Sequence, residues 1–131
     1  PGNIERSSLL LGDGAKLSLA ELAAFDFDGQ HLVTLSACET GVGGADGADG
    51  REVEGLNLVI LRRGAGTVLA SLWRVDDAST SRLMAVFYRE LERVPAAVAL
   101  QRAQEAVRGS RDGDWRSPFH WAGFYVTSRE P

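Results

Sequence analysis

Cysteine is nearly absent from this sequence, since Cys38 is the only one among 131 residues. A single thiol cannot close a disulfide within the chain, and it cannot build a metal site that needs several cysteines. Histidine is almost as scarce, with only His31 and His120. We therefore expect no metal centre, and any thiol chemistry must depend on Cys38.

Long apolar runs and clusters of basic residues are missing as well. No apolar run approaches the roughly 20 residues that span a bilayer, and no signal peptide is visible. The net charge is −4 and no face or tail is basic, which argues against binding nucleic acid through its phosphates. The remaining composition, 44% apolar and 24% charged, is ordinary. We expect one cytoplasmic domain that contacts neither nucleic acid nor membrane.

The stretch over residues 32–41 organises the chain. It begins with apolar and β-branched residues at 32–35, which predict a strand buried on both faces. Small residues follow, and then Cys38. Ligands of open α/β sheets bind outside the carboxyl ends of such strands, so Cys38 is a candidate nucleophile. A lone cysteine is also a common inert core residue, and the strand and thiol alone leave both interpretations open.

Apolar periodicity predicts an alternation of strands and helices. A capping box of Ser18 and Glu21 predicts the start of a short helix, and Gly64 is expected to end another helix. The expected strands cover 8–11, 31–37, 67–73 and 120–126, and the expected helices cover 19–25, 53–63, about 78–92 and 95–108. This order favours right-handed crossovers and a mostly parallel sheet in one α/β domain.

Residues 41–55 are rich in glycine and aspartate and are expected to form an exposed loop. The loop is either a regulatory segment that becomes ordered on activation or a tolerated insertion. Its aspartate spacing does not match a calcium-binding loop. Its glycines do not match a dinucleotide fingerprint, which makes a nucleotide-binding domain only a weak alternative. We therefore expect no cofactor.

Several strings of residues, in order along the chain, resemble the CHAT domain, a caspase-like domain often attached to tetratricopeptide repeats. The most specific are Ser-Ala-Cys-Glu-Thr-Gly at 36–41 and Ser-Leu-Trp-Arg-Val-Asp-Asp at 71–77, followed by Trp-Ala-Gly-Phe at 121–124. The resemblance implies a caspase-like three-layer (αβα), mostly parallel sheet. It also implies a cytoplasmic bacterial cysteine endopeptidase of the caspase and separase type, with Cys38 as the thiol of a Cys–His dyad.

The histidine of that dyad has no counterpart here, because the family carries it in a His-Gly motif on an earlier strand. His31 precedes Cys38 by seven residues on the same expected strand, which places them more than roughly 20 Å apart. His120 opens the last expected strand and is either a structural or surface histidine or a catalytic helper. Because the chain starts at Pro1, we expect residues 1–131 to be the C-terminal portion of a CHAT domain, N-terminally incomplete and inactive alone.

Two acidic residues, Asp76 and Asp77, follow the strand that ends near Trp73. In a caspase-like sheet this position faces the substrate residue before the cut, where a carboxylate would select Arg or Lys and Trp73 would form a wall. The alternatives are N-capping of the next helix by the aspartates and simple packing by Trp73. Both interpretations stay open for each residue.

The resemblance also sets the expected partners. These are a protein or peptide substrate and tetratricopeptide or other repeat modules. If the protein is not catalytic, it is a pseudo-protease that serves as an interaction or signalling module. Aromatic residues crowd the end of the chain, and apolar surface left uncovered there would drive self-association; they are Trp115, Phe119, Trp121, Phe124 and Tyr125.

Overall fold

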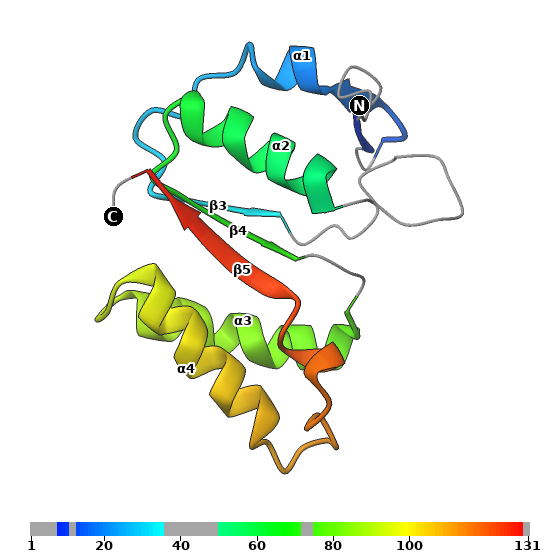
Figure 1. Cartoon of the computed structure of the whole chain (residues 1–131), viewed down its shortest axis with the longest axis vertical. Coiled ribbons are helices and arrows are strands. Elements are labelled where there is room, and N and C mark those ends of the chain that lie inside the picture. The colour runs from blue at the N-terminus through cyan, green and yellow to red at the C-terminus, as the bar shows by residue number, and fades with distance from the viewer. Residues whose placement is uncertain (1–7, 11–12, 36–49, 72–74, 130–131) are drawn as a thin grey trace. The chain divides into compact units, whose positions relative to one another are not determined.

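The computed structural model describes residues 8–10, 13–35, 50–71 and 75–129. In these ranges strands and helices alternate as expected for a mixed α/β protein (Figure 1). The chain divides into two compact units, one comprising residues 1–73 and 127–131 and the other residues 74–126.

The first unit opens with a hairpin and a short helix. Strands β1 (Ser8–Leu10) and β2 (Lys16–Ser18) pair antiparallel. The predicted capping box is confirmed, because Ser18 Oγ accepts from the Glu21 N–H at 3.1 Å and Glu21 Oε2 accepts from the Ser18 N–H at 3.0 Å. Helix α1 covers only Leu19–Leu22, shorter than the expected 19–25, because the chain leaves it through turns with three-residue hydrogen bonds such as Phe25 N–H to Leu22 O.

Strands β3 (Leu32–Leu35) and β4 (Thr67–Ser71) are parallel neighbours, with Leu35 opposite Ala70. The expectation that β3 is buried on both faces is wrong, since all four of its residues are half-buried, whereas residues 68–71 of β4 are buried. The strand order β3-β4-β5 explains the difference. Among the described strands β3 is at an edge and β4 has a neighbour on each side.

Helix α2 (Gly50–Arg62) covers the β3–β4 pair within the first unit (Figure 1). Its buried side joins β4 in a core cluster that also includes α1 and consists of Leu22, Leu56, Ile60, Leu61, Ala65 and Val68. The helix begins earlier than expected, so the prediction of a loop over 41–55 is wrong for residues 50–55. Adding turns to a helix already nucleated on a core costs little, even where glycine is present. Residues 41–49 lie outside the described part of the chain.

The last strand, β5 (Phe124–Ser128), begins four residues later than expected. A 3-10 helix, η2 (Pro118–His120), occupies the expected start, because Pro118 favours the first position of a helical turn. Thr67 Oγ1 lies 3.0 Å from Ser128 Oγ, and the Arg129 N–H donates to Gly66 O at 3.1 Å. The end of β5 therefore lies beside the start of β4, and the three-stranded sheet is mixed, which corrects the expected mostly parallel one.

The second unit is built on a pair of helices, α3 (Asp77–Leu91) and α4 (Ala96–Arg108), packed side by side (Figure 1). Their facing sides bury apolar and small residues, and Pro95 precedes α4 where a proline suits a helix start. Arg102 also reaches Glu90 across the pair at 2.8 Å, and this hydrogen bond lowers the pKa of Glu90. The buried set on the two helices is Leu83, Val86, Phe87, Ala99, Leu100, Ala103 and Val107.

Candidate functional site

The candidate nucleophile lies just beyond a described strand. Cys38 and Trp73 are both outside the described residues, so their proposed roles stay predictions. Three residues before Cys38, Leu35 ends β3, and its partner Ala70 is the next-to-last residue of β4. The two strands are parallel, so their carboxyl ends share one edge of the sheet, which is where ligands of α/β proteins bind.

Asp76 is the N-cap of α3, as one of the two sequence interpretations predicts. Its Oδ2 accepts a hydrogen bond from the Ser79 backbone N–H at 3.0 Å, which satisfies one of the free N–H groups at the helix start. That bond is the main cause of the lowered pKa of Asp76. Partial desolvation opposes it, and the electrostatic influence of the nearby His120 adds to the lowering. The carboxylate of Asp76 is therefore committed to the helix.

Asp77 differs from its neighbour. Both residues are exposed, but Asp77 is the first residue of α3 and does not cap it. Within the described ranges, no side chain or backbone group pairs with its carboxylate. The two aspartates thus divide the roles that the sequence left open. Capping belongs to Asp76, and Asp77 is the carboxylate still available to a ligand.

A contact that sequence reasoning missed joins the start of α3 to η2. His120 Nδ1 lies 3.3 Å from Ser79 Oγ, and the Ser79 hydroxyl donates its only proton to Asp76 O at 3.1 Å. Ser79 Oγ must therefore accept from His120, which places a hydrogen on Nδ1. The expectation that His120 opens the last strand is wrong, because it is the last residue of η2.

The cluster of Asp76, Ser79 and His120 holds structure together and does not form a catalytic triad. Ser79 is completely buried, and its hydroxyl proton is already engaged, so it is not a nucleophile. The spacing of Asp76 and Ser79 was readable as a helix cap. Nothing local in the sequence pointed to His120, which is 41 residues from Ser79.

Two findings limit the kinds of site in the described residues. Over these ranges, no group of three or more His, Cys, Asp or Glu side chains is arranged to hold a metal ion. Likewise, no helix in them has the length and apolar character needed to cross a membrane. His31, the other histidine, is exposed and directly precedes β3.

The elements described so far define a mixed α/β protein with a thiol a few residues beyond the end of a parallel strand. The profile of one family, described as the CHAT domain, matches residues 1–129. The chain therefore belongs to the CHAT domain family. No curated protein and no solved structure matches it.

Proposed function

We propose that this chain is part of a cysteine endopeptidase domain of the caspase and separase type, with Cys38 as the nucleophile. Family membership over residues 1–129 is the observation that carries the proposal. The position of Cys38, three residues past β3 and its in-register partner β4, supports it. Under this proposal the fold is the caspase-like three-layer (αβα) arrangement.

The proposed chemistry needs a base that residues 1–131 do not supply. An unperturbed thiol has a pKa of about 8.5 and is mostly protonated at neutral pH, so an imidazole must take its proton. The thiolate then attacks the peptide carbonyl, and the amine leaves with that proton. Water hydrolyses the resulting thioester. His31 directly precedes the strand that leads to Cys38, and His120 Nδ1 donates to Ser79. We therefore assign the base to a histidine elsewhere in the parent protein.

Asp77 is the better candidate of the two aspartates for reading the substrate residue before the cut. Its carboxylate is exposed, whereas that of Asp76 caps α3. A carboxylate pairs well with a guanidinium or ammonium group, so the proposed substrate carries Arg or Lys at this position. Trp73 is the proposed wall of the same pocket. The proposed partners in the parent protein are tetratricopeptide or other repeat modules.

The test is covalent labelling of the full-length parent protein with peptides that carry an electrophilic carbonyl after Arg, Lys or a neutral residue. We expect labelling of Cys38 that prefers Arg and Lys, disappears in Cys38→Ser, and loses its preference on Asp77→Asn. Asp112→Asn, which changes another exposed carboxylate, is the matched control. An unreactive Cys38 at neutral pH, with no cleavage of Arg- or Lys-containing peptides, would show instead a non-catalytic interaction module.

A further inference from the structure

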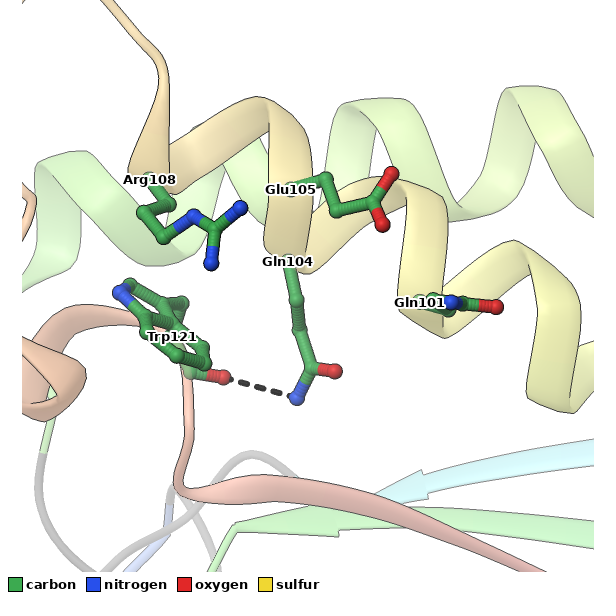
Figure 2. Close-up of a pocket in the computed structure, with 5 residues that line it drawn as sticks. All are labelled: Gln101, Gln104, Glu105, Arg108 and Trp121. Carbon is green, nitrogen blue, oxygen red and sulfur yellow. Dashed lines mark hydrogen bonds between the residues drawn. The ribbon is translucent and has the colours of Figure 1, made fainter.

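A small pocket lies on the second unit, and none of the residues that line it takes part in the proposed peptidase chemistry. It has a volume of about 190 Å³ and is lined by one side of α4 and by Trp121, which follows η2 (Figure 2). Pockets for drug-sized ligands occupy roughly 300–1,000 Å³, so this one suits a group of only a few atoms. The α4 residues that line it are Gln101, Gln104, Glu105 and Arg108.

Gln104 presents an acceptor of fixed orientation to this pocket. Its amide nitrogen donates to Trp121 O at 2.9 Å and to Phe124 O at 3.1 Å, so both amide hydrogens are in use. Two carbonyl partners require the nitrogen on their side, which turns Oε1 away from them. Figure 2 shows Oε1 on the side of Gln101. Oε1 is therefore a preset hydrogen-bond acceptor.

The indole ring of Trp121 offers a flat apolar surface. A hydrogen bond fixes one edge of the ring, and a cation–π contact covers one face. Its indole N–H donates to Arg116 O at 3.4 Å, and the Arg108 guanidinium lies 5.8 Å from the ring centre. Within the described chain, no group accepts a hydrogen bond from that guanidinium. Arg108 can thus donate to a ligand that rests against the indole.

The charges around the pocket balance, because Glu105 and Arg108 contribute one of each sign. An anionic ligand would be attracted by Arg108 but repelled by Glu105. A cationic ligand would be attracted by Glu105 but repelled by Arg108. A neutral planar group with an acceptor at one end and a donor at the other meets no such conflict. It receives a hydrogen bond from Arg108 and donates one to Gln104 Oε1.

We propose that this pocket binds a peptide group of an extended segment from a partner protein, stacked on Trp121 between Arg108 and Gln104. Trp and Arg are among the side chains most enriched at the centres of protein interfaces, and both line this pocket. The proposal does not use Cys38. It therefore holds or fails independently of the proposed peptidase activity.

The test is a titration of the ¹⁵N-labelled chain with N-acetylglycine methylamide, followed through the indole N–H signal of Trp121 and the side-chain amide signals of Gln104. We expect saturable shifts with a dissociation constant on the order of millimolar, as suits so small a ligand. N-acetylsarcosine dimethylamide, in which methyl groups replace both amide hydrogens of this probe, cannot donate a hydrogen bond to Gln104 Oε1. It should bind roughly fivefold more weakly.

Two substitutions and one control test the assignment of roles. Arg108→Gln and Trp121→Leu should each weaken binding of the methylamide, whereas Arg82→Gln, an exposed arginine of α3, should not. Acetate and guanidinium ions serve as competing probes. Saturable shifts with acetate alone would show that the pocket is an anion site, and shifts with guanidinium alone would show that it is a cation site. No shift with any probe would show that the pocket binds none of these groups. Each of these three outcomes overturns the proposal.

Discussion

At the scale of single residues, the carboxylate of Asp76 caps α3, and this structural role takes the place of binding a ligand. Its carboxylate binds the Ser79 N–H at 3.0 Å, and the Ser79 hydroxyl connects the same turn to His120. The hydrogen bond from the Ser79 N–H favours the ionised carboxylate and is the main reason why the pKa of Asp76 is lowered. Asp77, one position later, keeps a carboxylate exposed to solvent.

The lowered pKa of Asp76 makes a prediction about acid stability. A carboxylate whose pKa is lower in the folded protein than its ordinary value of 3.8 stabilises the fold above that value. The stabilisation is lost as the pH falls through the lower, folded value. Asp76→Asn keeps an oxygen acceptor for the helix but does not titrate. We expect the melting temperature of the wild-type protein to fall more than that of the variant between about pH 6 and pH 3.

Thermal unfolding followed by circular dichroism measures this difference. Asp112→Asn, at an exposed position of the loop after α4, controls for the loss of one negative charge. The variant at Asp112 should keep the wild-type acid response. Parallel acid curves for wild-type protein and Asp76→Asn would contradict the role assigned to the cap.

At the scale of elements, Gly64 decides how α2 ends and β4 begins. Its φ is +114°, a conformation that residues with a side chain rarely adopt. A Cβ at this position would also collide with Oδ1 and the backbone of Asp28. The predicted cap at the end of this helix is therefore confirmed, and it depends on both backbone conformation and close approach.

Gly64→Ala should destabilise the protein by about 2 kcal/mol or more, because strain at positive φ and the collision both act. Gly29→Ala is the matched comparison, since Gly29 has a φ of +84° but open space where a Cβ would lie. Its loss should be smaller. Urea unfolding measures both values, and equal losses would mean that Asp28 moves aside without cost.

At the scale of the whole molecule, the aromatic end of the chain is only partly used by the core. Phe124 is 4% exposed, but Phe119 keeps 49% of its surface in solvent and packs edge-on against His120. Phe124 is therefore part of the core, whereas about half of the Phe119 surface is exposed. Self-association through the exposed part stays a prediction.

Sedimentation velocity over a range of concentrations tests that prediction. We expect the wild-type chain to associate as its concentration rises, because uncovered aromatic surface favours contact between copies. Phe119→Ser should weaken the association. Phe25→Ser, which removes a side chain of similar exposure (53%) from the first unit, should not. A wild-type chain that stays monomeric throughout would rule the surface out as an interface.

The sequence by itself determined what depends on neighbours within a turn or two. The alternation of strands and helices follows from the apolar periodicity of each segment. The capping box of Ser18 and Glu21 and the cap by Asp76 each follow from two residues three positions apart. The strings around Cys38 and at 71–77 were also sufficient to indicate the family that the profile match confirms. Such signals survive in one dimension because the interacting groups are adjacent in it.

Only the tertiary structure decided what depends on distant segments. In the structure β5 runs antiparallel to β4, and His120 contacts Ser79 across 41 residues. Gln104 donates a hydrogen bond to the carbonyl of Trp121, 17 residues away. None of these contacts leaves a local pattern, because the two partners are far apart along the chain and because every residue type has a backbone carbonyl that can accept a hydrogen bond.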